Sequence, residues 1–186
     1  LRLALTGAAK MPEQVTNQLK DRYGLVVHEG YGLTESSPVV TTSVNGSHKV
    51  GSIGRPLQEV SLRLVDEHGD EAEEGDSGEI WVRGENVFAG YYNDQEATDR
   101  VLTADGWLRT GDIAVKDPDG DLFLVDRLKD LIIVSGFNVY PAEVEQVLLA
   151  HTGIDQAAVV GVSHPHTGEA VRAYVVLHKG VHLDEE

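Results

Sequence analysis

The chain has 186 residues, enough for one or two domains that bury a hydrophobic core. Its 31 acidic and 15 basic side chains leave a formal charge of −16, which argues against nucleic-acid or anionic-membrane partners because both require a basic face. It has no cysteine, which excludes disulfides and thiolate zinc sites, and no apolar stretch approaches the roughly 20 residues of a membrane helix.

The first 43 residues follow the order of an α/β unit. Residues 1–5 are a short apolar run that predicts a strand ending in a small-residue loop. Pro12 stands where a helix can begin, and apolar residues recur at helical spacing until Gly24, a natural helix stop. Residues 25–28 predict a second strand that breaks into a glycine-containing turn at 29–32. Ligands bind at the ends of such strands in open α/β sheets.

The middle of the chain changes to an antiparallel β pattern. Residues 60–65 and 79–83 alternate as strands do, and the connection 66–76 holds seven carboxylates and no Lys or Arg, which is typical of a solvated hairpin connection. A second hairpin is predicted around the turn 117–120, where Pro and Gly are turn formers. We expect a small antiparallel sheet or barrel here.

The last part of the chain predicts a small α+β domain. Residues 131–134 are typical of a buried strand that ends at Ser135-Gly136. Pro141 then opens a helix with glutamates in its first turn. Two apolar strands follow at 157–162 and 171–177.

One candidate motif is Gly30-Tyr31-Gly32-Leu33-Thr34-Glu35. Two glycines beside Tyr31 would let a planar ligand lie on its ring. The hydroxyl of Thr34 could then donate to a phosphate, and Glu35 is a hard oxygen ligand suited to Mg²⁺ on that phosphate. An ordinary glycine-rich turn with a helix N-cap at Thr34 or Ser36 is about equally compatible with this segment alone.

A second candidate is Trp107-Leu108-Arg109-Thr110-Gly111-Asp112. A carboxylate after a glycine, at the start of a strand, can accept two hydrogen bonds from a ribose diol. Taken alone, a turn aspartate that caps backbone amides is the better interpretation.

The third candidate is the segment 126–145, where charged residues cluster between a predicted hairpin and a predicted strand. A solvated hinge between domains requires such a cluster, because hinge residues absorb large changes in backbone angles. The alternative is an ordinary surface turn.

Together these segments resemble the adenylate-forming enzymes, which include acyl- and aryl-CoA synthetases, firefly luciferase and peptide-synthetase adenylation domains. The segment 78–84, followed by Gly90-Tyr91-Tyr92, matches a further motif of that family. The sequence Val-Ser-Gly-Phe-Asn-Val-Tyr-Pro at 134–141 is more similar to that of fatty-acyl-CoA or aryl-CoA ligases than to that of peptide synthetases. The resemblance implies that residues 1–127 are the C-terminal part of the large AMP-binding domain and that 128–186 are most of the small C-terminal domain.

The resemblance also implies the site residues. Tyr31 would stack on adenine, Thr34 would hold the AMP phosphate, and Glu35 would coordinate Mg²⁺. Asp112 would hold the ribose hydroxyls together with Arg127. The residues assigned to ATP or AMP are Gly7, Ala8, Ala9, Gly30, Tyr31, Gly32, Leu33, Thr34, Asp112, Leu124 and Arg127, of which Gly7, Ala8 and Ala9 would line the adenine and acyl pocket and Leu124 would pack near the base.

In the small domain, the resemblance places the hinge at Lys129 and the path of the CoA pantetheine at Ser135, Gly136 and Phe137. The implied reaction joins a carboxylic acid, expected to be a fatty acid, to the α-phosphate of Mg-ATP, and CoA then displaces AMP from the acyl-AMP. Positioning and electrostatic stabilisation supply most of that catalysis. We expect a cytoplasmic protein; the oligomeric state is not indicated.

Two segments of the family pattern are missing from this sequence: the Lys-containing phosphate loop and the C-terminal lysine motif. We therefore expect the chain to be part of a longer enzyme and to lack ligase activity alone. The alternatives are an aryl-acid CoA ligase and a truncated AMP/ATP-binding module without turnover.

Three other features are interpreted as structural. The segment 117–128 lacks the turn glycine and the final glutamate of a calcium loop, so we predict a hairpin turn. His164-Pro165-His166 lacks a third metal ligand and is interpreted as a surface turn. The Tyr91-Tyr92 pair is interpreted as sheet packing.

Overall fold

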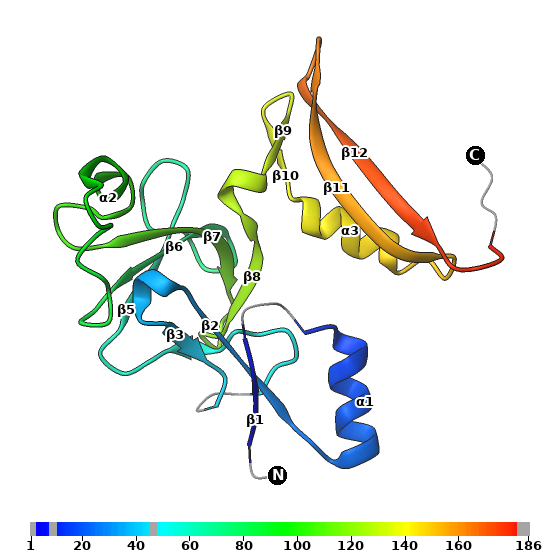
Figure 1. Ribbon diagram of the computed structural model, residues 1–186, viewed down its shortest axis with the longest axis horizontal. Helices are drawn as coiled ribbons and strands as arrows, with labels where there is room; N and C mark the ends of the chain where they lie inside the picture. Colours follow the sequence, from blue (N-terminus) through cyan, green and yellow to red (C-terminus); the bar gives the residue numbers. More distant parts are fainter. Residues whose placement is uncertain (1–2, 8–10, 45–47, 182–186) are drawn as a thin grey trace. The chain divides into compact units, whose positions relative to one another are not determined.

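The computed structural model describes residues 3–7, 11–44 and 48–181 (Figure 1). The chain forms two compact units, Leu1–Leu124 and Val125–Glu186. Each combines helices with sheets, so the predicted mixture of α/β and α+β structure is confirmed. The expected domain boundary between residues 127 and 128 lies three residues beyond the division between the units. Among the described residues, no helix is both long and apolar enough to span a bilayer.

The first unit begins with the predicted strand, helix and strand. Its first sheet has the order β1-β2-β3-β4, with β1 and β2 parallel and the other pairs antiparallel. Helix α1 ends at Gly24, which adopts a left-handed conformation (φ 64°) that a glycine enters without steric cost. The elements of this part are β1 (Ala4–Thr6), α1 (Glu13–Tyr23), β2 (Val27–Gly32), β3 (Val39–Thr42) and β4 (Arg55–Pro56).

Strand β2 is longer than predicted, and the turn expected at 29–32 is wrong. Gly30 pairs with Thr42 and Tyr31 with Thr41, so the glycine-containing segment continues the strand. The chain turns only at residues 33–38, around the short 3₁₀ helix η1 (Thr34–Ser36). Pairing with β3 supplies the hydrogen bonds that keep the segment extended despite its two glycines.

The second sheet of this unit contains both predicted hairpins, and its strand order is β5-β6-β7-β8. In the turn between β7 and β8, Asp117 Oδ1 accepts hydrogen bonds from the backbone N–H groups of Asp119 and Asp121, which confirms a hairpin turn. No group of three or more side chains suited to a metal ion occurs in the described part of the chain. The elements are β5 (Ser61–Val65), β6 (Ser77–Arg83), α2 (Gln95–Val101), β7 (Leu108–Lys116) and β8 (Leu122–Arg127).

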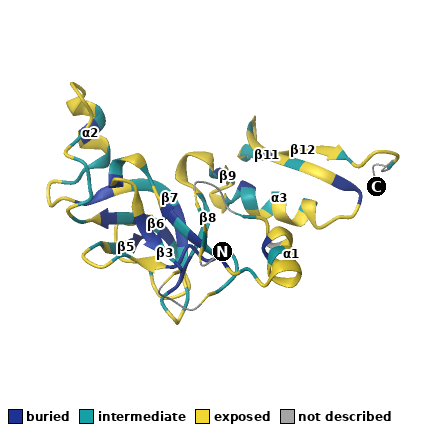
Figure 2. Ribbon diagram, turned by 60° about the horizontal axis from the view of Figure 1, so that its bottom comes forward, coloured by how far each residue is buried: buried dark blue, intermediate teal, exposed yellow. Residues whose placement is uncertain are grey.

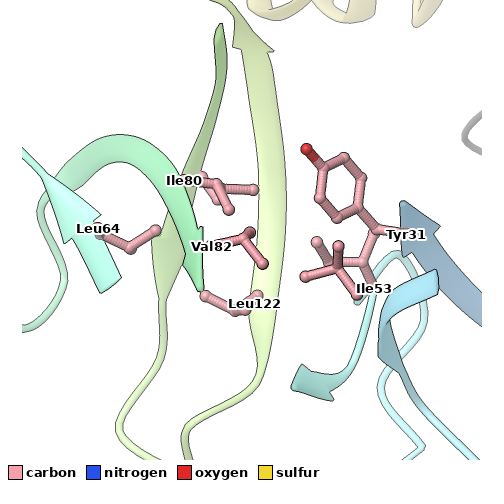
Figure 3. Packing of buried hydrophobic residues seen from close by; sticks show 8 residues of the cluster. Tyr31, Ile53, Leu64, Ile80, Val82 and Leu122 are labelled. Atoms are coloured by element: carbon pink, nitrogen blue, oxygen red, sulfur yellow. The ribbon is translucent and has the colours of Figure 1, made fainter. Parts of the chain in front are cut away.

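The two sheets of the first unit share one hydrophobic core (Figure 3). Buried residues concentrate on strands β3, β6 and β7 in Figure 2. Tyr31 of β2 belongs to this core, and its hydroxyl points away from Ile53 (Figure 3). The cluster consists of Tyr31, Val40, Ile53, Leu64, Ile80, Val82, Ala114 and Leu122.

The second unit is the predicted small α+β domain, with α3 lying along β11 (Figure 1). Strand β10 was not predicted: Ser135 and Gly136 have positive φ (51° and 84°) and turn the chain back into a hairpin. The strand expected at 131–134 is present as β9, but it is not buried throughout, because Ile132 is buried and Ile133 is 49% exposed. The elements are η2 (Leu128–Asp130), β9 (Ile132–Val134), β10 (Phe137–Val139), α3 (Pro141–Leu149), β11 (Ile154–His164) and β12 (Gly168–Leu177), in the sheet order β10-β9-β12-β11. His164 ends β11 at the hairpin turn, as predicted.

Candidate functional site

The loop between β2 and β3 carries Thr34 and Glu35 and is held closed by Ser36. The fully buried Ser36 hydroxyl lies 2.9 Å from the Leu33 carbonyl and 2.8 Å from the Pro38 carbonyl, and it is 3.2 Å from the Leu33 amide. Leu33 N–H also donates to Pro38 O at 2.9 Å. These bonds span the base of the loop, so Thr34 and Glu35 project from a closed turn.

Gly32 is required where β2 enters this loop. A Cβ at this position would lie 1.8 Å from Pro38 O and 2.7 Å from Pro38 C, both backbone atoms. A side chain therefore cannot be accommodated by rotation of a neighbour. The close approach of the two backbones explains the second glycine of the motif by packing.

Glu35 is oriented by a segment more than 50 residues away in sequence. Tyr91 Oη donates to Glu35 Oε1 at 2.8 Å, and Phe88 N–H donates to the Glu35 carbonyl at 2.8 Å. The hydrogen bond to the carboxylate and, secondarily, partial burial raise the pKa of Tyr91 above its ordinary value. The interpretation of Tyr91 and Tyr92 as sheet packing was wrong: neither lies in a strand, and Tyr92 is 93% exposed.

The first and second sequence motifs meet through Tyr31 and Asp112. The Tyr31 hydroxyl donates to Asp112 Oδ2 at 2.7 Å, across 81 positions of sequence. Only 8% of Tyr31 is exposed, because the residue packs in the hydrophobic core cluster. The structure thus brings a phenol and a carboxylate together at the edge of the core.

Asp112 was predicted at the start of a strand. It lies instead inside β7, at an irregularity in the pairing with β6. Gly111 has φ 72°, and its N–H donates to Glu79 Oε1 at 2.9 Å. Thr110 Oγ1 donates to Ile80 O at 2.8 Å and accepts from Asp112 N–H at 3.1 Å. A bulge of this kind re-aims a side chain, which here is Asp112.

Other predicted nucleotide residues of the first unit lie around the same strands. A Cβ on Gly7 would lie 3.3 Å from Gly30 O, which places these two glycines side by side at the pairing of β1 with β2. Leu33 and Leu124 are partly buried and pack against the core cluster that includes Tyr31. Ala8 and Ala9 lie outside the described residues.

The remaining predicted residues belong to the second unit. Arg127 is exposed at the end of β8, and Lys129 is exposed in η2, where it lines a cavity of about 470 Å³. Three carboxylates of this cavity have a structural role, because Asp126, Glu145 and Glu169 each accept a hydrogen bond from a backbone N–H group. Ser135, Gly136 and Phe137 form the tip of the β9–β10 hairpin, and Phe137 is 75% exposed.

The sequence analysis missed Tyr91, Glu79 and Thr110 as residues that hold the site. Tyr91 stands in the glycine-tyrosine segment of the further family motif, which was the available signal. Glu79 and Thr110 form hydrogen bonds between β6 and β7. Neither segment of the sequence alone indicates that these two strands pair.

Comparison with known proteins decides the family. A family model described as AMP-binding enzyme matches residues 1–92, and one described as AMP-binding enzyme C-terminal domain matches residues 143–186. A long-chain-fatty-acid–CoA ligase of Yersinia pestis is 48% identical over 177 residues, which are 95% of this chain and 31% of that protein. The chain belongs to the AMP-binding enzyme family.

Other members of the AMP-binding enzyme family resemble the chain over the same extent. A probable 4-coumarate–CoA ligase 3 of Dictyostelium discoideum is 41% identical over 100% of this chain and 34% of its own length. The crystal structure of ATP-bound MatB from Rhodopseudomonas palustris superposes with a TM-score of 0.91 at 39% identity, over 98% of this chain and 37% of that one. The chain thus spans about a third of the length of the curated relatives that it matches.

Glu35 is the described residue best suited to hold Mg²⁺ in this AMP-binding enzyme. Mg²⁺ is commonly bound by one or two carboxylates together with substrate phosphates and water, and not by a cage of protein ligands. A lone carboxylate on a closed loop, as Glu35 is, has the chemistry that this pattern requires. The hydrogen bond to the Glu35 carboxylate is made at Oε1, and no described residue forms a hydrogen bond with the other oxygen, Oε2.

Proposed function

We propose that the protein acts as an AMP-forming carboxylic acid–CoA ligase, with ATP, CoA and a carboxylic acid as substrates. The observation that carries this proposal is the Tyr31–Asp112 hydrogen bond, which joins the two motifs to which the resemblance assigns adenine and ribose. Membership of the AMP-binding enzyme family and the names of the relatives support the same reaction.

In this proposal the first unit binds the nucleotide. Adenine stacks on Tyr31, which is 8% exposed, and the ribose hydroxyls donate to Asp112, whose position the bulge in β7 sets. Gly7, Ala8 and Ala9 are proposed to line the adenine and acyl pocket, Gly30, Gly32 and Leu33 to contribute to nucleotide binding, and Leu124 to pack near the base. Thr34 donates to the α-phosphate from a loop that Ser36 keeps closed.

Glu35 would hold Mg²⁺ on the phosphates through its carboxylate. The ion, when bound, offsets the charge of the phosphate oxygens during attack at the α-phosphorus. The protein's own contribution is to hold Thr34 and Glu35 together on one short closed turn. Such pre-organisation is the main protein contribution to phosphoryl chemistry.

In the second unit, Lys129 is proposed as the hinge and Ser135, Gly136 and Phe137 as the path of the CoA pantetheine. Lys129 lies in a single 3₁₀ turn between β8 and β9, a short element that can absorb changes in backbone angles. The exposed Phe137 ring at the hairpin tip offers an apolar contact for an incoming thiol chain. Arg127 is proposed as a further nucleotide-binding residue.

A fatty acid is the proposed acyl substrate, because the 48% identical relative is named for long-chain fatty acids. An aryl acid is the second candidate, because the relative that is 41% identical is named for 4-coumarate. Both chemistries share the nucleotide site described above and differ in the acyl pocket.

The proposal is tested by measuring pyrophosphate release by the product of the complete open reading frame that contains this sequence. The assay uses Mg-ATP with a panel of fatty and aryl carboxylic acids, with and without CoA. We expect acid-dependent pyrophosphate release with fatty acids and thioester formation with CoA. Turnover of aryl acids alone would overturn the acyl assignment, and nucleotide binding without any turnover would overturn the activity. Asp112→Asn should weaken AMP binding, whereas the matched Asp119→Asn change on the exposed turn should not.

A further inference from the structure

We infer that Tyr91 is a positioning residue that orients the Glu35 carboxylate toward the metal-bearing phosphates of the nucleotide. This inference rests on the proposed function, since it assigns a task to a residue beside the proposed Mg²⁺ ligand. Nothing in the motif 30–35 itself determines the direction of the Glu35 side chain, because Glu35 lies in a single 3₁₀ turn and its long side chain has several rotamers.

Two hydrogen bonds from the segment 88–91 restrict Glu35, one at its carboxylate and one at its backbone. Tyr91 Oη donates to Oε1 at 2.8 Å, which selects one oxygen and one rotamer. Phe88 N–H donates to the Glu35 carbonyl at 2.8 Å, which fixes the backbone of the same residue. With Oε1 engaged, the carboxylate presents Oε2 as its remaining metal-binding oxygen. Partners of metal ligands commonly act in this way: they set the orientation of the ligand and raise metal affinity.

Tyr91 is itself held by helix α2. Its backbone N–H donates to Thr98 Oγ1 at 2.9 Å, and the same hydroxyl donates to Asp94 O at 2.8 Å. Thr98 is buried, and a Cβ on the preceding Gly90 (φ 135°) would lie 2.7 Å from its methyl carbon. The segment before α2 is therefore packed onto the helix too closely for a side chain at residue 90.

The Tyr91 ring also packs edge-on against Phe88, with centroids 5.0 Å apart. This packing would persist in a phenylalanine variant, whereas the bond to Glu35 would not. Tyr91→Phe therefore separates the structural task of the ring from the positioning task of the hydroxyl. Tyr92→Phe is the matched control, because Tyr92 is adjacent in sequence and 93% exposed.

Calorimetric titration with ATP in the presence of Mg²⁺ or of EDTA, and with AMP in the presence of EDTA, tests this inference. Four forms of the complete open-reading-frame product are compared: wild type, Tyr91→Phe, Tyr92→Phe and Glu35→Gln. We expect Tyr91→Phe to weaken Mg²⁺-dependent ATP binding about tenfold. Metal-free AMP binding and the urea unfolding midpoint should stay within error of wild type, and Tyr92→Phe should match wild type throughout.

The double variant distinguishes positioning from a separate effect. If Tyr91 acts through Glu35, adding Tyr91→Phe to Glu35→Gln should cause no further loss of Mg²⁺-dependent binding. Wild-type affinity in Tyr91→Phe, alongside clear loss in Glu35→Gln, would overturn the role of Tyr91 and leave the proposed function intact. Equal loss of metal-free AMP binding would show a structural role and overturn positioning. ATP binding that does not depend on Mg²⁺ in wild type would overturn both proposals.

Discussion

Substitution of Gly32 by alanine tests the closed loop that carries Thr34 and Glu35. The added Cβ would lie 1.8 Å from Pro38 O, and real Cβ contacts essentially never fall below 3.0 Å. The Pro38 carbonyl must therefore retreat by about 1.2 Å. The strain is purely steric, because Gly32 does not have a positive φ.

The cost follows from the bonds that the Pro38 carbonyl makes. It accepts from Leu33 N–H at 2.9 Å and from the Ser36 hydroxyl at 2.8 Å, and a shift of that size breaks or weakens both. Each is worth about 0.5–1.5 kcal/mol, and overpacking of the backbone adds about 1 kcal/mol or more. We expect Gly32→Ala to lower the free energy of unfolding by roughly 2–4 kcal/mol.

Urea unfolding followed by tryptophan fluorescence measures this change selectively. The chain has two tryptophans, Trp81 and Trp107, and both lie in the first unit, so the signal reports on that unit. With a urea dependence of about 2 kcal/mol per molar, the midpoint should fall by about 1–2 M. The matched control is Gly69→Ala, where a Cβ meets nothing within 4 Å and only the positive φ (91°) costs about 1 kcal/mol.

A midpoint for Gly32→Ala equal to or above that of Gly69→Ala would refute the steric argument. A large loss of stability with unchanged affinity for AMP would show that the loop is rigid but is not needed to bind the nucleotide.

Three further predictions use the same unfolding assay. Asp94→Ala removes the side chain that accepts from Ala97 N–H at 2.9 Å at the start of α2, and should cost about 1 kcal/mol; an unchanged midpoint would show that this N-cap is not stabilising. Ile80→Ala empties a fully buried position at the centre of the core and should cost about 2–5 kcal/mol, so a loss below 1 kcal/mol would contradict the assigned core. The hydrogen bond from Lys49 holds the pKa of Asp117 below its ordinary value, so the stability that it contributes is complete above about pH 4 and is lost as the pH falls through the lowered pKa. Lys49→Met should therefore reduce the fall of the urea midpoint below about pH 4. An unchanged fall of the midpoint in that pH range would contradict the Lys49–Asp117 pair.

Local features of the fold were predictable because their causes are local. Pro12 and Gly24 delimit α1 by the missing N–H of one and the left-handed backbone of the other, and both effects act within a single turn. The hairpins around 66–76 and 117–120 follow from turn residues between alternating strands.

Predictions failed where pairing with a distant segment decides the backbone. Gly30 and Tyr31 were expected in a turn, but Thr41 and Thr42 supply strand partners that keep them extended. Asp112 was expected at a strand start, but its position in a bulge of β7 depends on Glu79 of the neighbouring strand.

The sequence by itself determined the family motifs, their order and the chemical types of the candidate ligands, because these depend on residue identity and spacing alone. Only the tertiary structure decided which of them act together. The hydrogen bonds Tyr31–Asp112 and Tyr91–Glu35 join residues 81 and 56 positions apart. A hydrogen bond requires heavy atoms about 2.7–3.2 Å apart in a defined direction, and over such separations only the packing of the sheets and loops sets that geometry.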